Sequence, residues 1–431
     1  MRYSVPKGLF DIVPQETKAD EAWRSSSRWQ HLEKHMRQLA HDYGYAEIRT
    51  PIFERTELFV RGVGESSDIV SKEMYTFNDK ADRSMTLRPE GTAPVMRAFV
   101  EKGLHQLGQF HKFFYIGPYF RYDRPQAGRY RQFHQFGIEA IGDPSPEQDA
   151  EVIAMLADLY TRLGLKGWTV LINTVGDADC RDPFRAALKD YLKPHFDKLS
   201  QDSKARFEKN PLRILDSKDQ GDQELLKGAP NIHDFLNAAS KAHFESVCSH
   251  LKALDIPYSV TPNLVRGLDY YNQTVFEITA TALGAQNSLG AGGRFDGLLA
   301  AVGGPDLPST GFACGLERIL ITMDAQNCTF DTAYHPFIYV VALGEKAFDT
   351  AYQHTFELRR GGIPSDIAPK GRKVQKALQL ADQKQATYAL VLGDDEIQSG
   401  KAKLKHLQSR EEKEIDLTAM LTTCEKLYAS H

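Results

Sequence analysis

The chain has 431 residues, of which 42% are hydrophobic and 26% are charged, and its formal net charge at pH 7 is −4. This length exceeds one typical hydrophobic core, and the composition is that of an ordinary globular protein, so we expect two or three domains. A slightly acidic chain is not a globally basic nucleic-acid-binding protein, and any RNA-binding surface must therefore be local.

Targeting and redox features favour a cytoplasmic protein. Residues 1–8 contain no apolar run of signal-peptide length, and no stretch reaches the roughly 18 apolar residues of a membrane span. The five cysteines are odd in number, widely scattered and without a Cys-x-x-Cys pair. We therefore expect a reducing cytoplasmic location, with no structural zinc site, disulfide framework or membrane partner.

Hydrophobic spacing predicts the elements of the first three quarters of the chain. A helix is expected over residues 17–42, a strand over 46–51, short strands with glycine-rich turns over 85–142, and a helix over 147–163. Residues from about 179 to 250 are polar, lysine-rich and mostly helical in pattern. This change predicts a helical insertion between two parts of one sheet domain.

From about residue 258 onward, the pattern of expected elements changes. Strand-like sequence returns near Tyr258 and a helix is expected from Gly315. Beyond them, strands and helices of similar length alternate at residues 337–342, 346–359, 363–367, 374–383 and 388–392. This alternation predicts right-handed βαβ units. We therefore expect a first domain over residues 1–328, a linker near 328–336, and a small separate α/β domain over 335–431.

Residues 264–276 are the most informative segment, because one guanidinium and two phenols occur in a run that otherwise reads as a strand. Successive side chains of a strand point to opposite faces, so Arg266 and the pair Tyr270 and Tyr271 can line a cavity while Val275 and Phe276 enter the core. An ordinary half-buried strand with a tyrosine on each face is the alternative.

A hairpin with a cationic tip is predicted over residues 114–139. Two apolar strands flank a Pro-Gln-Ala-Gly turn near Arg124, Arg129 and Arg131. Arginine suits a phosphate, since its planar fork donates two parallel hydrogen bonds and keeps its charge, and Phe133 could stack on a base. Solvated arginines on a surface hairpin are the alternative.

Small residues at 311, 313 and 315 permit close backbone approach, and Arg318 follows them at the start of a helix. An ion pair between Arg318 and Glu317 or another acid is the alternative. Two nucleotide-binding patterns fail: Gly290-x-Gly292 lacks a third glycine, and Gly400-Lys401 lacks the remainder of a phosphate loop.

Taken together, these segments resemble the class II aminoacyl-tRNA synthetases. Phe120-Arg121 with Arg-x-x-x-Phe at 129–133 resembles motif 2, residues 309–320 resemble motif 3, and residues 45–51 resemble the dimer element, motif 1. The resemblance implies an α+β catalytic domain, an antiparallel sheet flanked by helices with a helical insertion, plus a C-terminal α/β anticodon-binding domain. It also implies a homodimer.

The same resemblance assigns an ATP site. Arg121 would hold the α-phosphate, Phe133 would stack on adenine, and Arg318 would cover the adenine ring and contact the γ-phosphate. Asp123 stands where the family usually has a glutamate, and its shorter side chain would have to reach the adenine amino group.

Residues 264–276 and 291–298 resemble two signatures of the histidyl-tRNA synthetases. This resemblance makes Arg266, with Arg121, a catalytic cation that stabilises charge on the α-phosphate. It assigns histidine binding to a further set of side chains: Glu90, Gly91, Thr92, Gln135, Glu139, Tyr270 and Tyr271. Within it, Glu90, Thr92 and Gln135 would hold the ammonium, while Glu139 and Tyr271 would read the ring nitrogens.

Glu139 also stands out without the resemblance, since Phe136, Ile138, Ala140 and Ile141 surround it in sequence. An unpaired charge among such residues is unfavourable, which argues against an ordinary surface acid.

The resemblance therefore implies a histidine–tRNA ligase that forms histidyl-adenylate from L-histidine and ATP with Mg2+ and transfers the acyl group to tRNA(His). A histidine-sensing regulatory subunit of ATP phosphoribosyltransferase is one alternative, but those relatives lack an anticodon domain and lose catalytic arginines, whereas Arg121, Arg266 and Arg318 are present. A synthetase for another amino acid is the second alternative. A kinase-linked sensor of uncharged tRNA would need a domain for which the chain has no room.

Overall fold

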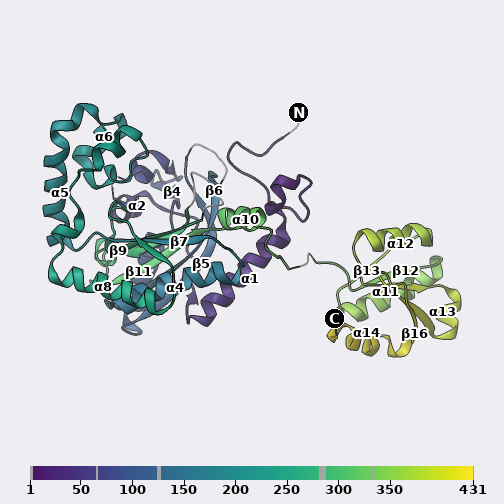
Figure 1. Cartoon of the computed structure of the whole chain (residues 1–431). Helices are drawn as coiled ribbons and strands as arrows, with labels where there is room; N and C mark the ends of the chain where they lie inside the picture. Colours follow the sequence, from purple (N-terminus) through teal and green to yellow (C-terminus); the bar gives the residue numbers. More distant parts are fainter. Residues whose placement is uncertain (1–2, 65–66, 124–127, 281–287, 332–333, 431) are drawn as a thin grey trace. The chain divides into compact units, whose positions relative to one another are not determined.

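The computed structural model describes residues 3–64, 67–123, 128–280, 288–331 and 334–430. It divides into two compact units, Met1–Asp331 and Thr332–His431 (Figure 1). Among the described residues, no helix is both long and apolar enough to cross a membrane.

An eight-stranded sheet forms the centre of the first unit, with the strand order β1-β5-β6-β11-β10-β9-β7-β8. Its central strands pair antiparallel, and the two edge strands, β1 and β8, pair parallel with their neighbours. The strands are β1 (Ala46–Glu47), β5 (His111–Phe120), β6 (Gln132–Ile141), β7 (Trp168–Thr174), β8 (Tyr258–Val260), β9 (Asn272–Ala280), β10 (Ser288–Arg294) and β11 (Ser309–Gly315). The predicted antiparallel sheet is thus confirmed.

A second, three-stranded sheet has the order β2-β4-β3 and is antiparallel throughout. It consists of β2 (Phe53–Arg55), β3 (Tyr75–Asn78) and β4 (Ser84–Leu87). Short helical segments adjoin the two sheets: η1 (Ala19–Arg24), α2 (Thr56–Val63), η2 (Ile69–Glu73) and η3 (Leu104–Gln106).

Helices cover the large sheet because each presents an apolar face to it. One large core cluster joins Ile138 and Phe276 of the sheet to Met36, Ile153 and Ile319 of the covering helices. These helices are α1 (Ser26–Asp42), α4 (Pro146–Arg162) and α10 (Leu316–Ala325). A smaller cluster contains residues of α3 (Thr92–Glu101) and α9 (Leu298–Ala301).

The stretch between β7 and β8 is helical, and polar N-caps start most of its helices. The side chains of Asp177, Ser200, Asp219 and Asn237 each accept a hydrogen bond from a backbone N–H in the first turn that follows. The helices are α5 (Ala178–Leu192), η4 (Lys193–Lys198), α6 (Gln201–Lys209), η5 (Pro211–Ile214), α7 (Gln220–Leu226), η6 (Ile232–Phe235) and α8 (Ala238–Ala253).

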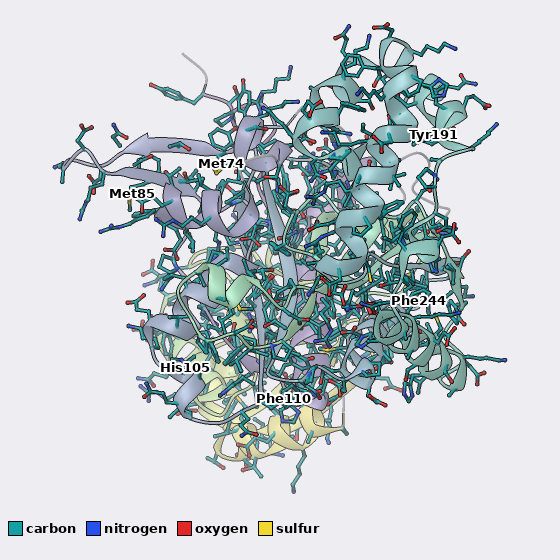
Figure 2. The ribbon with its side chains drawn as sticks, turned by 90° about the vertical axis from the view of Figure 1, so that its left-hand side faces the viewer. Met74, Met85, His105, Phe110, Tyr191 and Phe244 are labelled. Carbon is teal, nitrogen blue, oxygen red and sulfur yellow. The ribbon has the colours of Figure 1, made fainter. Side chains whose placement is uncertain are left out.

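This helical stretch has two parts. Helices α5 to η6 pack in a second core cluster, which joins Phe184, Leu188 and Ile214 to Val265 and Val275. Helix α8 instead belongs to the large core cluster of the sheet through Phe244 and other residues. Figure 2 shows Tyr191 of α5 near the upper end of the view and Phe244 of α8 below it. We therefore use the word insertion below for residues 178–235.

The second unit contains a five-stranded sheet of order β13-β12-β14-β15-β16, of which the first three strands are parallel. The predicted alternation of strands and helices over residues 337–392 is confirmed. The elements are β12 (Ile338–Ala342), α11 (Glu345–Arg360), β13 (Ser365–Ile367), α12 (Val374–Gln383), β14 (Tyr388–Leu392), α13 (Asp394–Ser399), β15 (Lys401–His406), β16 (Glu412–Asp416), η8 (Leu417–Ala419) and α14 (Met420–Ala429).

Three local predictions are wrong. Strand β9 begins only at Asn272, so residues 264–271 form a loop, and strand alternation does not orient Arg266. Residues 46–51 contain only the two-residue strand β1. Residues 85–142 include helix α3, which begins because the Glu90 carboxylate accepts hydrogen bonds from the N–H groups of Thr92 and Ala93 at 2.8 and 3.0 Å.

A buried ion pair joins α4 to the end of β10. Arg294 and Asp149 are both 1% exposed, and their side chains meet at 2.8 Å (Nη2 to Oδ1) and 3.2 Å (Nε to Oδ2). Arg294 also donates to the carbonyl oxygens of Asp143 and Ser145. Asp149 further contacts His243 Nε2 at 2.8 Å.

Arg294→Met should destabilise the first unit by about 3–5 kcal/mol, because it leaves a buried carboxylate without its main counter-charge. Urea denaturation would measure this loss. Lys227→Met is the control, since its pair with Glu224 is exposed on both sides and such pairs contribute little. Equal effects of the two substitutions would contradict the importance of the buried pair.

Candidate active site

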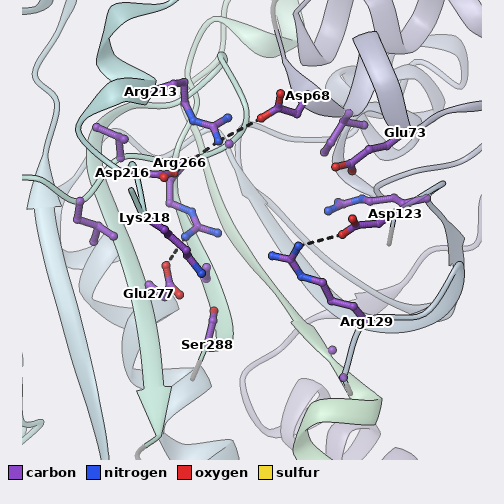
Figure 3. Close-up of a pocket in the computed structure, with 18 of the residues that line it drawn as sticks. Asp68, Glu73, Asp123, Arg129, Arg213, Asp216, Lys218, Arg266, Glu277 and Ser288 are labelled. Carbon is purple, nitrogen blue, oxygen red and sulfur yellow. Dashed lines mark hydrogen bonds and ion pairs between the residues drawn. The ribbon is translucent and has the colours of Figure 1, made fainter. Parts of the chain in front are cut away.

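A pocket of about 1120 Å³ lies in the first unit, between the large sheet, the end of the β5–β6 hairpin, segment η2 and the insertion (Figure 3). It brings together six of the predicted site residues: Arg121, Asp123, Phe133, Gln135, Arg266 and Arg318. Cationic, acidic and aromatic side chains therefore share one concave surface.

Arg121 lies directly after β5, where a backbone bond from its N–H to Arg131 O (2.9 Å) closes the hairpin. Its side-chain Nε donates to Pro89 O at 2.8 Å, and its guanidinium lies 5.2 Å from the centre of the Phe133 ring. Burial lowers the pKa of Arg121, and nearby Glu73 opposes this change. An arginine that is desolvated and fixed in this way is well suited to hold an anion.

The end of the hairpin carries a second arginine. Arg129 Nη1 contacts Asp123 Oδ2 at 3.0 Å, and Figure 3 shows both side chains at the edge of the pocket. Asp123 is thus paired with an arginine of its own hairpin. Arg124, which we placed at the tip, lies outside the described residues.

Arg318 extends from the first turn of α10 and bonds to backbone carbonyls of two other segments. Its Nε donates to Gly128 O at 3.1 Å and its Nη1 to Ser288 O at 2.8 Å. The neighbouring Glu317 carboxylate accepts hydrogen bonds from the N–H and ring Nδ1 of His134 at 2.8 and 3.0 Å. Two backbone carbonyl groups therefore fix the orientation of the guanidinium.

Arg266 reaches the pocket from the loop before β9. Its Nη1 contacts Glu277 Oε2 at 2.7 Å, and its Nε is buried without a hydrogen-bond partner among the described residues. Since arginine has five N–H donors in a fixed fork, the contact with Glu277 orients the group while other donors stay available.

The remaining predicted residues form a buried polar cluster beside this pocket instead of lining it. Glu139 on β6 is 1% exposed and accepts a hydrogen bond from the Tyr115 hydroxyl at 3.1 Å. Burial raises the pKa of Glu139 well above its usual value, and the charge of Glu90 adds to the shift. Glu90 and Thr92 are also buried.

Two tyrosines complete the cluster. The rings of Tyr270 and Tyr271 have centres 4.7 Å apart, and both pack against Phe295. Burial raises the pKa of Tyr271 to about 12, and it raises the pKa of Tyr270 well above its usual value. Both hydroxyls are therefore neutral hydrogen-bonding groups near pH 7.

Gly91 and Gln135 have different relations to the cluster. A Cβ atom at Gly91 would lie 2.5 Å from the Tyr115 ring, so any larger residue at this position would clash with the ring. Gln135 lines the pocket, and its Oε1 is buried without a hydrogen-bond partner within the described parts of the chain. A buried amide oxygen of this kind is an acceptor suited to a ligand cation.

Several side chains at the site were missed in the sequence. Glu277 pairs with Arg266, Glu73 lines the pocket near Arg121, and Tyr115 bonds to Glu139. Glu277 could have been found, because it is an acid in an otherwise apolar strand that follows the arginine loop directly. Glu73 and Tyr115 carry no comparable signal, since only the fold brings them to the site.

The antiparallel sheet, the arginine-bearing hairpin and the arginine at the start of α10 define a class II aminoacyl-tRNA synthetase. Residues 19–319 match the family model described as histidyl-tRNA synthetase, and residues 338–427 match the model described as anticodon binding domain. The chain belongs to the histidyl-tRNA synthetase family, and the family resemblance drawn from its motifs is confirmed.

Individual relatives agree with this assignment. A histidine–tRNA ligase of Protochlamydia amoebophila (strain UWE25) is 54% identical over 98% of this chain and 99% of its own length. One of Desulforamulus reducens is 47% identical over 96% and 97%. The apo histidyl-tRNA synthetase structure of S. aureus superposes with a TM-score of 0.83 at 37% identity, covering 98% of this chain and 99% of its own.

The regulatory-subunit alternative is not favoured. A structure described as an ATP phosphoribosyltransferase regulatory subunit/histidyl-tRNA synthetase, from Bacillus halodurans C, is only 20% identical, with a TM-score of 0.61 over 91% of this chain and 98% of its own. That likeness concerns the fold alone, whereas the relatives described as histidine–tRNA ligases are much closer in sequence.

Replacing the buried acid Glu139 should change how the stability of the protein depends on pH. Because the folded protein raises the pKa of Glu139, the folded state binds the proton more tightly, and stability falls as the pH rises from about 4.5 through the raised value. Glu139→Gln has no proton to lose, so it should raise the melting temperature more at about pH 8 than at about pH 5.

Thermal melting of both proteins at the two pH values would test this expectation. Glu208→Gln, at a side chain that is 76% exposed, is the control and should show no such pH dependence. An equal gain at both pH values would contradict the inferred cost of ionising Glu139.

Proposed function

We propose that this chain is a histidine–tRNA ligase, which activates L-histidine with ATP and then transfers the histidyl group to the 3′ end of tRNA(His). The observation that carries the proposal is the convergence of Arg121, Arg266 and Arg318 on one pocket beside the buried polar cluster around Glu139. Three cations suit a triphosphate, and a buried acid with neutral hydroxyls suits an imidazole.

ATP would occupy the part of the pocket between the hairpin and α10. Arg121 would bind the α-phosphate, with Phe133 beneath the adenine ring and Arg318 against the ring and the γ-phosphate. The contact between Arg121 and Phe133 supports this arrangement, since it places a phosphate-binding group next to an aromatic surface. Asp123 would share its carboxylate between Arg129 and the adenine amino group.

Histidine would lie between this region and the buried cluster. Gln135, with its buried Oε1, and Thr92 would hold the ammonium group together with Glu90. Glu90 would act partly through α3, because its oxygens already accept two backbone N–H groups. Glu139 and Tyr271 would bind the two ring nitrogens, with Tyr270 supporting Tyr271 and Gly91 leaving room for Tyr115.

Arg266 would act in the activation step. When the histidine carboxylate attacks the α-phosphate, a carboxyl-to-phosphorus bond forms, the bond to pyrophosphate breaks, and negative charge builds on the phosphoryl oxygens. A pre-oriented guanidinium stabilises that charge in a pocket of reduced dielectric. Its pairing with Glu277 supports this role, since the guanidinium is oriented before the substrate binds.

Other parts of the proposal rest on the family. Mg2+ would be bound with ATP, because it prefers phosphate oxygens and one or two carboxylates, and acidic side chains line the pocket. The second unit would bind the tRNA anticodon, and the enzyme would act as a cytoplasmic homodimer. Exposed Ile52 and Phe53, just after the motif 1 segment, support a subunit contact.

ATP–pyrophosphate exchange measured with each of the twenty amino acids would test the function. The proposal requires exchange that depends on histidine. Exchange driven by a different amino acid would support the other synthetase alternative, and the absence of exchange would support a binding protein.

Arg266→Ala should lower the rate of histidine-dependent exchange by about 10²–10³-fold, because one electrostatic donor at the reacting phosphate is removed. Binding of tRNA should change much less, since Arg266 does not face RNA in this proposal. Arg162→Ala, at an arginine of α4 that pairs with Asp42 of α1 and with Asp158, is the control. Exchange by Arg266→Ala within tenfold of the parent would refute the assigned role.

Tyr271→Phe tests ring recognition, because it keeps the ring volume and removes one hydroxyl. A buried ring nitrogen that loses its partner weakens binding by about 1–3 kcal/mol. The Michaelis constant for histidine should therefore rise, that for ATP should change much less, and preference over an analogue lacking one ring nitrogen should fall.

Tyr43→Phe is the matched control, since this tyrosine bonds to Asp158 and lies outside the pocket lining. Equal changes in both Michaelis constants for Tyr271→Phe, with analogue preference intact, would make Tyr271 a packing residue.

A further inference from the structure

The loop that carries Arg266 is anchored by side chains of the insertion. Asn210 Nδ2 donates to Asp269 Oδ1 at 2.6 Å, and Arg181 Nη1 donates to Tyr271 O at 2.9 Å. Gly267 also lies close to Arg213, because a Cβ atom at this glycine would be 3.3 Å from Nη1 of that arginine. All three contacts lie on the C-terminal side of Arg266, at Gly267, Asp269 and Tyr271.

The loop needs such anchors because it precedes strand β9 and lies outside the ladder of the sheet. Its backbone N–H groups at Leu264 and Asp269 bond to Thr261 O at 2.9 Å and Val63 O at 3.3 Å. The second of these is long for a backbone bond. The position of Arg266 therefore depends on contacts that side chains make with its loop.

The same part of the insertion also holds the segment next to Arg121. Arg206 and Arg213 contact Asp68 Oδ2 at 3.0 and 3.7 Å, and Figure 3 shows Arg213 pointing toward Asp68 above Arg266. Burial disfavours the ionised form of Asp68, but Arg206 and Arg213, with Lys72, outweigh this effect and lower its pKa. A charged Asp68 thus fixes the start of η2 against the insertion.

Segment η2 continues this connection to motif 2. It ends at Glu73, whose carbonyl accepts a hydrogen bond at 2.6 Å from the N–H of Tyr122, the residue after Arg121. Helices α6 and η5 therefore connect to both arginine-bearing segments: through Asn210 to the Arg266 loop, and through Arg206 and Arg213 to η2.

We propose that Asn210 and Arg181, supported by Arg206 and Arg213, are positioning residues for histidine activation, so that the insertion is required for adenylate formation before any tRNA binds. This inference rests on the proposed function and adds a role for the insertion in its first step. A helical module that served only to dock RNA would have no need of contacts with the Arg266 loop.

The size of the expected effect follows from geometry. The guanidinium must match the phosphate position closely, and a displacement of about 1 Å in such a group lowers the rate by about 10²-fold. Loss of the bond from Asn210 removes one of the contacts that hold Asp269, which is three residues from Arg266 and next to Tyr270. Histidine use should therefore suffer more than ATP binding, which relies on Arg121 and Arg318.

The test is histidine-dependent ATP–pyrophosphate exchange by the full-length enzyme, without tRNA. Asn210→Ala should lower kcat/KM for histidine by up to about 10²-fold, with a smaller change in the Michaelis constant for ATP. Glu208→Gln, two residues before Asn210 in α6, is the matched control, since it breaks an exposed pair with Lys189 (2.6 Å) and should leave exchange unchanged.

A swap of donor and acceptor tests the bond itself. Asn210→Asp places two carboxylates together and should impair exchange, whereas Asn210→Asp combined with Asp269→Asn restores one amide and one carboxylate and should recover most of the activity. A purely structural role would not produce this recovery together with unequal effects on the two Michaelis constants.

Three outcomes would overturn the inference: unchanged exchange in Asn210→Ala with impaired tRNA charging, a double variant no better than Asn210→Asp, or equal increases in both Michaelis constants. A parent enzyme without histidine-dependent exchange would instead overturn the proposed function. The two failures are therefore distinguishable in one set of assays.

Discussion

The site depends on one constraint, which is the accommodation of the buried Glu139 carboxylate in the middle of a sheet. Strand β6 lies between β5 and β11, where Glu139 stands opposite Phe113 and Gly311. A Cβ atom at Gly311 would lie 2.5 Å from Glu139 Oε2, so only glycine fits there. Gly311, one of the small residues that we expected to permit close backbone approach, thus makes room for an acidic side chain of the protein itself.

The same constraint extends to the Tyr115 ring, which reaches Glu139 across the sheet. Cβ atoms at Gly91 and Gly137 would lie 2.5 and 2.3 Å from this ring. A carboxylate with a raised pKa is tolerated at this depth because the hydroxyl of Tyr115 supplies a hydrogen bond. Gly91 before α3, Tyr115 of β5 and Gly311 of β11 are therefore constrained by the need to bury this one acid.

The arginines of the pocket are held by two kinds of hydrogen-bond acceptor. Arg121 and Arg318 donate to the backbone carbonyl oxygens of Pro89, Gly128 and Ser288, which orient each guanidinium. Arg266 donates to the carboxylate of Glu277. Carboxylates also act on the first two arginines, since Glu73 favours the charged form of Arg121 and Glu277 that of Arg318.

How far the sequence predicted the molecule depends on the range of the interactions involved. Local patterns predicted the alternating elements of residues 337–392, because periodicity and turn residues act over a few positions, whereas the antiparallel sheet was expected from the family resemblance. They missed helix α3, which depends on the Glu90 cap, and they misread residues 264–271 as a strand.

The candidate site divides in the same way. The residues found by motif, such as Arg121 and Arg318, lie in short segments with characteristic spacing, and the structure gathers them in one pocket. Glu73, Tyr115, Arg181 and Asn210 act through contacts between segments far apart in sequence. Their residue types are common on any helix or strand, so only the tertiary fold distinguishes them.

The misread segment is also the most instructive, because a loop serves Arg266 better than a strand. In a strand, the ladder would fix the direction of the side chain and would bring it to the pocket only at alternate positions. In the loop, Gly267 allows close approach of Arg213, while Asp269 and Tyr271 supply acceptors to Asn210 and Arg181. Strand β9 then begins just beyond, so that Glu277 stands where it can hold the guanidinium. The loop gains from these contacts the fixed position that it cannot obtain from the sheet.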